Sequence, residues 1–382
     1  MANALLVDTN FSSGPILAFL KHQGHTVYCC GGKPTDHLAK ATEGYIPLDY
    51  SDPNALRALC EELNIAHLVP GCNDLSYWAC AQVSAQHPFT GLDSVETTHT
   101  LNNKAHFRQF AQRQGLSVPT VFDVQHALPQ QAVVVKPVDA FSGKGITIVE
   151  HPTRQALDLA IQSAQHVSRS GAWVVEQYIE GQLYSHSAFI AQGRIVQDFL
   201  VIEHGSANRF VVDTSHMALN FPTALLANIR AEIEHMAHTL ALCDGLLHTQ
   251  FIVQNNRFYL IETTRRCPGD LYSQLIELST GFPYAASYAM PFLGLSVQPQ
   301  TTTTRHILRH TLTLPQASVL AHLQFEGPLN IERWVPLATT GDPIAPSPHS
   351  RIALLFAHCP TQAELHTLAT RTTARQLYRI NG

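Results

Sequence analysis

Two short apolar runs, separated by a polar segment with glycine and lysine, constrain the fold of this chain more than any other stretch. Val133–Val135 and Ile146–Val149 consist of β-branched residues and predict two buried strands joined by a turn. Glycines let backbone amides approach an anion closely, and lysines neutralise its charge, so the turn is suited to a polyphosphate. The residues that carry this prediction are Lys136, Ser142, Gly143, Lys144 and Gly145.

The segment is not a Walker A loop. That motif needs Ser or Thr after its lysine and then a helix, whereas Gly145 follows Lys144 and a strand comes next. An ordinary hairpin with a solvated lysine is the alternative interpretation. Lysine usage favours phosphate binding, because two of the six lysines in the chain lie here. A compact ammonium on a flexible stem suits phosphate well.

The composition predicts a globular protein of several domains. The chain has 382 residues, 45% of them hydrophobic and 14% charged, with a formal charge of -5. Without a basic field, nonspecific binding to nucleic acid is not expected. The sequence after Met1 lacks a basic, apolar leader, and no apolar run reaches about 18 residues, so we expect no membrane association and a cytoplasmic location. Eight scattered cysteines without CxxC spacing predict reduced core thiols.

The first 115 residues alternate short strands with helices. We expect strands at Ala4–Val7, His25–Cys30, His67–Val69 and Phe89–Leu92, and helices that begin after Ser12 or Ser13, Asp52 and Asn73. This alternation predicts a parallel sheet with helices on both faces. The first strand-to-helix turn lacks GxGxxG, which argues against a dinucleotide site.

The rest of the chain predicts further α+β units. A helix near 103–114 precedes a small unit over 118–179, and a hairpin then turns at Gln192-Gly193. A helix over 224–243 and two strands joined at Asn255-Asn256 follow, and Asp270 is expected to cap the next helix. Residues 295–304 form the best linker. We therefore expect domains at 1–115, 116–180, 181–300 and 301–382.

Charged and polar residues of five motifs stand in a fixed order along these units: Lys104, Lys136, the glycine segment, Glu176 in VVEQYI, and Glu262 with Arg266 in ETTRRCPG. This order resembles the ATP-grasp superfamily of carboxylate–amine and carboxylate–thiol ligases, most of all its carbamoyl-phosphate-synthase-like and amino-acid ligase branch. The resemblance covers about residues 4–288. It implies an α/β fold in which a parallel N-terminal domain precedes α+β lid and catalytic subdomains, followed here by a small C-terminal domain.

The resemblance also implies an ATP site. Lys104 and Lys136 match the two family lysines that contact the ATP phosphates, and the segment Ser142 to Gly145 matches the mobile glycine loop that covers them. Glu176 would accept from the adenine amino group. The backbone of Gln177 and Ile179 would complete recognition of the adenine edge.

A magnesium and substrate site is implied at the end of the last catalytic strand. Family members carry Glu-x-Asn-x-Arg-x-x-Gly there, and this chain has Glu262, Thr264, Arg266 and Gly269. Glu262 would bridge Mg²⁺ to the nucleotide. Arg266 would hold the transferred phosphate with its planar fork. The resemblance adds Gln250 and Thr264 as metal residues, Lys144 beside Arg266 in catalysis, and Gly269, His248 and His216 as substrate contacts.

Three positions depart from the family pattern. Gln250 replaces a magnesium carboxylate, Thr264 replaces the usual Asn, and Leu183 replaces the acid that contacts ribose. A glutamine carbonyl ligates Mg²⁺ without charge, so these changes weaken the metal site. His248 is either a substrate contact or a packed core residue. Cys267, next to Arg266, is either a nucleophile or a small core residue.

The resemblance implies an ATP-dependent ligase that joins a small-molecule carboxylate, most simply an amino acid, to an amine through an acyl phosphate. Two alternatives stay open: a nucleotide-binding regulatory protein with a decayed metal site, and a relative of the bicarbonate-activating carboxylases. A homodimer is compatible with the family, and the sequence leaves the oligomeric state open.

Overall fold

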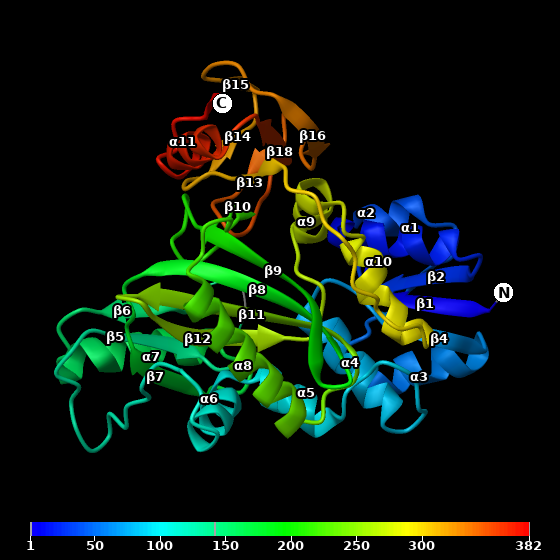
Figure 1. The fold of residues 1–382 in the computed structure, drawn as a ribbon, viewed down its shortest axis with the longest axis horizontal. Coiled ribbons are helices and arrows are strands. Elements are labelled where there is room, and N and C mark those ends of the chain that lie inside the picture. Colours follow the sequence, from blue (N-terminus) through cyan, green and yellow to red (C-terminus); the bar gives the residue numbers. More distant parts are fainter. Residues whose placement is uncertain (1, 141–142, 382) are drawn as a thin grey trace.

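The N-terminal region is built on a parallel sheet, as the alternating pattern predicts. The computed structural model describes residues 2–140 and 143–381. Its first sheet has the strand order β3-β2-β1-β4, and all pairs are parallel. The strands are β1 (Asn3–Val7), β2 (Thr26–Gly31), β3 (Tyr45–Pro47) and β4 (Ile65–Pro70). This region forms the blue right-hand part of Figure 1.

Two helices in this part of the chain begin after their expected caps, Asp52 and Asn73, and a third begins after Ser13, whose side chain makes no capping hydrogen bond. The side chain of Asp52 accepts from Asn54 and Ala55 N–H, and that of Asn73 accepts from Ser76 N–H. The helices and the first 3-10 turn are η1 (Phe11–Ser13), α1 (Gly14–His22), α2 (His37–Ala41), α3 (Pro53–Glu62), α4 (Asp74–Ser84), α5 (Val95–Asn102) and α6 (Lys104–Arg113), the last capped by Asn103.

The predicted strand at Phe89–Leu92 is wrong. These residues form a turn, and the fourth strand of the sheet is β3. Thr90 Oγ1 donates to the carbonyl of Phe292 at 3.1 Å, so the turn is held against a distant part of the chain. Apolar residues at a turn that packs on another segment resemble a strand when only the local sequence is considered.

The expected hairpin around the glycine segment is confirmed. Strands β5 (Val133–Pro137), β6 (Thr147–Val149) and β7 (Trp173–Gln177) form an antiparallel sheet of order β6-β5-β7. Helix α7 (Arg154–Val167) packs on this sheet, and a separate small core lies between them. This lid lies at the left of Figure 1, far from the N-terminus.

An eight-stranded sheet with the order β12-β11-β8-β9-β10-β13-β18-β16 forms the centre of the molecule. Its first hairpin turns at Gln192 and Gly193, which both have positive φ, as that turn sequence predicts. The elements are β8 (Gln182–Ala191), β9 (Arg194–His204), β10 (Thr214–Met217), α8 (Thr223–Thr239), β11 (Gly245–Gln254), β12 (Arg257–Thr264), β13 (His306–Leu312), β16 (Ile331–Pro336) and β18 (Ala353–Cys359).

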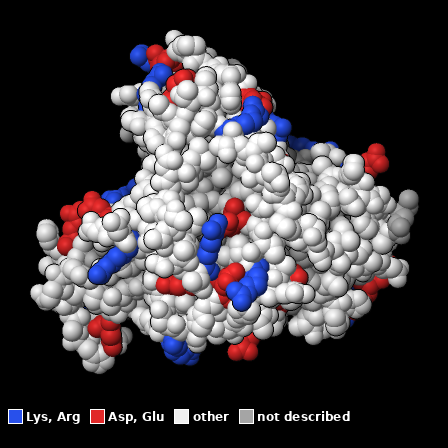
Figure 2. Space-filling view, viewed as in Figure 1, with Lys and Arg blue, Asp and Glu red and all other residues white. Residues whose placement is uncertain are grey.

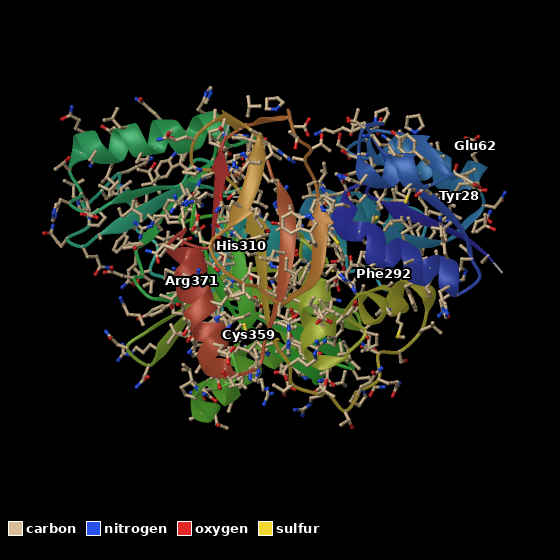
Figure 3. The ribbon with its side chains drawn as sticks, turned by 90° about the horizontal axis from the view of Figure 1, so that it is seen from above. Tyr28, Glu62, Phe292, His310, Cys359 and Arg371 are labelled. Carbon is tan, nitrogen blue, oxygen red and sulfur yellow. The ribbon has the colours of Figure 1, made fainter. Side chains whose placement is uncertain are left out.

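This sheet runs across the boundary expected at residue 300. Residues 295–305 lack regular structure, as a linker would, yet β13 returns to pair with β10. The C-terminal residues therefore extend the central sheet. The remaining elements are α9 (Tyr272–Thr280), α10 (Tyr284–Ala289), η2 (Met290–Leu293), β14 (Ser318–Val319), β15 (His322–Phe325), β17 (Pro343–Ile344), α11 (Gln362–Thr373) and β19 (Tyr378–Asn381). Figure 3 shows α11, with Arg371, beside the C-terminal strands.

The expected cap at Asp270 is wrong. Asp270 and Leu271 both have φ near 52°, and Leu271 precedes α9 without a side-chain cap. The Asp270 carboxylate instead contacts Arg351 at 2.8 Å and accepts from Thr311. It thereby ties the start of α9 to the C-terminal strands.

The surface and the cysteines agree with the composition. Charged side chains are sparse on the face shown in Figure 2, in line with 14% charged residues. All eight cysteines are free thiols, and Cys267 is a buried core residue. Among the described residues, no helix is both long and apolar enough for a membrane span.

Candidate active site

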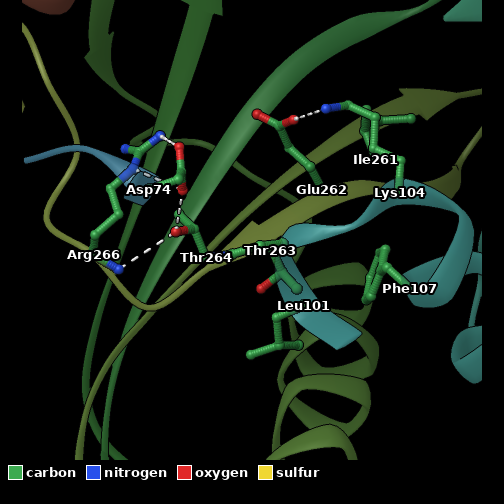
Figure 4. Close-up of a pocket in the computed structure, with 10 residues that line it drawn as sticks. Asp74, Leu101, Lys104, Phe107, Ile261, Glu262, Thr263, Thr264 and Arg266 are labelled. Atoms are coloured by element: carbon green, nitrogen blue, oxygen red, sulfur yellow. Dashed lines mark hydrogen bonds and ion pairs between the residues drawn. The ribbon is translucent and has the colours of Figure 1, made fainter. Parts of the chain in front are cut away.

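One pocket brings together residues from the N-terminal sheet, the α5–α6 segment and strand β12 (Figure 4). Asp74 begins α4 directly after the carboxyl end of β4, where ligand sites of parallel sheets usually lie. Lys104 begins α6, and Glu262 and Thr264 stand at the end of β12. The polar lining residues are Asp74, Asn102, Lys104, Glu262, Thr263, Thr264 and Arg266.

Arg266 is held on one wall of the pocket by Asp74. Its Nε and Nη2 lie 3.1 Å and 3.2 Å from the two carboxylate oxygens, and Thr264 Oγ1 donates to the same carboxylate at 2.8 Å. Burial opposes ionisation of Asp74, but the charge of Arg266 and the hydrogen bonds outweigh it, so the pKa of Asp74 is lowered. Asp74 occupies one edge of the guanidinium, which leaves Nη1 to contact an anion.

Lys104 and Glu262 face Arg266 across the pocket. Lys104 Nζ lies 3.8 Å from Glu262 Oε2 and donates to the carbonyl of Ala140 at 2.9 Å. The side chain of Glu262 is 45% exposed, whereas that of Lys104 is 11% exposed. Lys104 therefore links the first residues of the glycine segment to the carboxylate predicted to bind metal.

Lys136 lies behind the pocket in a buried cluster of three charges. Its Nζ is 2.8 Å from Glu176 Oε2, and Arg108 Nε is 3.0 Å from Oε1 of the same carboxylate. Arg108 Nη2 also donates to the carbonyl of Ile261 at 2.7 Å. Burial lowers the pKa of Lys136 to about 8, although Glu176 acts in the opposite direction.

This cluster changes the role expected for Glu176 at the adenine edge. Its carboxylate is 1% exposed and occupied by Lys136 and Arg108, so the structure does not present this carboxylate to adenine. Gln177 N–H already donates to the carbonyl of Thr120 at 2.8 Å. Gln177 lies at the end of β7, and Ile179 follows it as a buried residue.

The glycine loop needs its glycines for conformation and for space. Gly143 and Gly145 have φ of 68° and 70°. A Cβ on Gly143 would lie 2.7 Å from Phe210 Cβ, so the loop rests on the segment between β9 and β10. Lys144 between them is exposed. Ser142, the first expected phosphate contact, lies outside the described residues.

The three expected metal residues do not contact one another. Gln250 and Glu262 are cross-strand partners, but Gln250 Nε2 donates to Glu203 Oε2 at 2.6 Å. Thr264 donates to Asp74 instead of facing Glu262. Among the described residues, no group of three or more His, Cys, Asp or Glu side chains is arranged to hold a metal ion.

The histidines expected at the substrate are buried. His248 Nδ1 lies 3.0 Å from Ser187 Oγ, and burial lowers the pKa of His248 to about 3, as for a packed core residue. His216 is 2% exposed and its ring lies 5.8 Å from that of His366 on α11. Its neighbour Ser215, which points to the other face, accepts from Arg309. Gly269 precedes α9 close to the carbonyl of Cys72.

Comparison with known proteins agrees with this geometry. Residues 129–274 match the family model described as "ATP-grasp domain". The chain contains an ATP-grasp domain. The expected family is thereby confirmed, and ATP with Mg²⁺ is the cofactor pair of ATP-grasp enzymes.

Relatives in sequence and structure extend the match to both sides of this domain. The carbamoyl phosphate synthase large chain of Vibrio vulnificus is 25% identical over 223 residues, 55% of this chain and 20% of that protein. The structure of the L-amino acid ligase from Bacillus licheniformis has a TM-score of 0.80 at 17% identity and covers 100% of this chain and 99% of its own.

The biotin carboxylase domain of Hydrogenobacter thermophilus 2-oxoglutarate carboxylase, solved with MgADP and bicarbonate, has a TM-score of 0.79 at 16% identity, covering 100% of this chain and 91% of its own. These likenesses confirm the expected α/β ATP-grasp fold.

The donor atoms near the end of β12 fit a magnesium ion. Glu262 supplies an accessible carboxylate, and Gln250, its cross-strand partner, supplies an amide carbonyl. Mg²⁺ prefers oxygen ligands and needs one or two protein carboxylates when nucleotide phosphates and water complete its octahedron. The hydroxyl of Thr264 is committed to Asp74, so the structure favours Glu262 and Gln250 of the expected set.

Three residues that contact the predicted site residues were not singled out by the sequence reasoning: Asp74, Arg108 and Glu203. Asp74 could have been found from its place after a parallel strand, since the carboxyl ends of such strands form ligand sites. Arg108 stands four residues after Lys104, on the same face of α6. Glu203 carries no local signal, because it is one polar residue near the end of an amphipathic strand.

Proposed function

We propose that this protein is an ATP-dependent carboxylate–amine ligase that works through an acyl phosphate and releases ADP and phosphate. The observation that supports it best is the pocket between two ion pairs, Lys104–Glu262 and Asp74–Arg266. Lys104 can turn from Glu262 to a phosphate, and Arg266 can contact a phosphate while it stays bound to Asp74. Lys104 of this pocket donates to the carbonyl of Ala140, next to the glycine segment, and Lys136 lies in the buried charge cluster with Glu176.

The reaction has two steps. A substrate carboxylate oxygen attacks the γ-phosphorus of ATP, the bond to the β-phosphate oxygen breaks, and ADP leaves. The nitrogen of a neutral amine then attacks the acyl carbon, the carbon–oxygen bond to phosphate breaks, and the proton lost from nitrogen passes to phosphate or solvent. Amino acids are the proposed substrate class, which the structural likeness to an L-amino acid ligase favours.

The charged residues of this chain act by neutralising the negative charge of the phosphates. Lys104 and Lys136 would neutralise the β- and γ-phosphates, and Lys144 would cover them from the glycine loop. Arg266, held at its outer edge by Asp74, would present Nη1 to the transferred phosphate. Glu262 and Gln250 would hold Mg²⁺, which would supply further neutralisation of the phosphates.

The nucleotide product tests this proposal. The protein is incubated with MgATP and pooled carboxylates and amines, and nucleotides are separated by chromatography while condensation products are identified by mass spectrometry. We expect ADP and a condensed mass when a cognate carboxylate and amine are both present. AMP as the product would overturn the acyl-phosphate mechanism. Bound ATP without turnover across broad pools would favour a nucleotide-binding regulator.

A further inference from the structure

Gln250, where the family has a metal carboxylate, is bound to a buried carboxylate two strands away. Gln250 lies on β11 and pairs with Ser185 on β8, whereas Glu203 lies on β9 and pairs with Leu183. Side chains at these positions share one face of the sheet, because residues two apart on a strand point the same way. The small side chain of Ser185 lets the two long side chains meet above β8, and Nε2 and Oε2 are 2.6 Å apart.

This contact sets the direction of the amide. In the structure the NH₂ of Gln250 faces Glu203, and Nε2 donates to the carboxyl oxygen Oε2. The carbonyl oxygen is then the polar atom of Gln250 that remains for a metal ion. With the amide reversed, the side chain would present N–H groups to the metal site, and these cannot bind a cation.

Glu203 is also held in place from other sides. It is 4% exposed, and burial raises its pKa, while the hydrogen bond from Ser185 and the positive charge of Arg309 act in the opposite direction. Arg309 itself donates to Ser215 at 3.0 Å and to the carbonyl of Asp270 at 2.9 Å. The orientation of Gln250 is therefore tied to a rigid, buried part of the sheet.

We propose that Glu203 is a positioning residue of the magnesium site. It holds the Gln250 amide so that the carbonyl oxygen serves the metal beside Glu262. This inference rests on the proposed function, since it concerns the metal of the same reaction. It explains how the chain retains a metal site although glutamine replaces a carboxylate.

The test measures metal affinity rather than turnover. Binding of Mn²⁺, the probe for Mg²⁺, is followed by electron paramagnetic resonance with ADP present, in the wild type, Glu203→Gln and Glu232→Gln. Glu232 on α8 accepts from Ser117 N–H and Oγ at 2.9 Å and 2.6 Å, so its variant makes the same chemical change remote from the metal site. We expect Glu203→Gln to weaken Mn²⁺ binding about tenfold or more, as for other residues that orient metal ligands. Glu232→Gln should bind as the wild type does.

An exchange variant keeps the test decisive if Glu203→Gln does not fold. Gln250→Glu combined with Glu203→Gln retains one amide and one carboxylate in contact, with the carboxylate now beside Glu262. It should bind Mn²⁺ at least as tightly as the wild type, and weaker binding would overturn the inference. Wild-type affinity in folded Glu203→Gln would do the same. A wild-type protein that binds neither Mn²⁺ nor ADP would instead overturn the proposed function on which the inference rests.

Discussion

The molecule contains two clusters of opposite charges that differ in their access to solvent. In the buried cluster, Arg108, Glu176 and Lys136 have side chains that are 1%, 1% and 5% exposed. In the pocket, the pairs Lys104–Glu262 and Asp74–Arg266 have side chains between 11% and 45% exposed. Both clusters pair lysine and arginine with carboxylates, but their surroundings differ.

The difference sets how freely each charge can change partner. A buried charge without its partner is very unfavourable, so the three members of the buried cluster depend on one another. Arg108 Nε and Glu176 Oε1 lie close without hydrogen-bond geometry, and Arg108 Nη1 lacks a partner among the described residues. In the pocket, water reaches Glu262, so Lys104 can turn to a phosphate at small cost.

The largest expected effect is on stability, from Glu176→Ala. This change leaves Lys136 and Arg108 buried without their carboxylate and should lower the free energy of unfolding by about 3–5 kcal/mol. Urea denaturation measures it. Glu232→Ala removes a carboxylate that accepts hydrogen bonds from neutral groups and should cost about 1 kcal/mol. If the free energy of unfolding falls equally in the two variants, the buried cluster stabilises the fold no more than ordinary hydrogen bonds do.

The second effect is on turnover, from Arg266→Ala. Loss of a charge that contacts the transferred phosphate should lower kcat about a hundredfold or more, without unfolding the protein. Asp74→Asn keeps the Arg266 guanidinium and weakens only the contact that holds it in place, so it should lower kcat less. Steady-state ADP release with the cognate substrates measures both.

The matched control for Arg266→Ala is an arginine on α8. Arg230 contacts Asp198 with two nitrogens at 2.6 Å and 2.8 Å, like the pair in the pocket, but outside the pocket lining. Arg230→Ala should keep wild-type kcat. If Asp74→Asn lowers kcat as much as Arg266→Ala does, kcat depends on the Asp74–Arg266 ion pair and not on a contact between Arg266 and phosphate.

Local sequence predicts much of this fold because local contacts set it. Asp52, Asn73 and Asn103 cap the helices that they precede, and the turns at Gln192-Gly193 and Asn255-Asn256 have the positive φ that such residues tolerate. The hairpin around the glycine loop follows from two β-branched runs. In each case the deciding interaction lies within a few residues.

The errors and omissions come from contacts between distant residues. Asp270 has a left-handed backbone and binds Arg351 instead of capping α9, and the C-terminal strands join the central sheet across a linker. Lys104, Glu262 and Arg266, which the sequence predicts to act together, line the same pocket. Their partners escaped notice because Asp74 and Arg266 are 192 residues apart, and Gln250 and Glu203 are 47 apart.

The third and smallest expected effect is a pH dependence that distinguishes the two clusters. Burial lowers the pKa of Lys136 to about 8, below its ordinary value of 10.5. Without nucleotide, Lys136 therefore carries its charge below about pH 8 and loses it as the pH rises beyond. If Lys136 contacts the ATP phosphates, binding requires the charged form, so a proton has to be taken up above this pH.

ATP affinity should then fall by up to about tenfold per pH unit above pH 8, since one pKa unit corresponds to about 1.4 kcal/mol. Isothermal titration calorimetry from pH 7 to pH 9.5, in buffers of different ionisation enthalpy, measures both the affinity and the proton uptake. Lys136→Arg keeps the charge throughout this range and should flatten the profile. A wild-type affinity that is constant with pH, with no proton uptake, would place Lys136 with Arg108 as a structural charge and leave phosphate binding to Lys104 and the glycine loop.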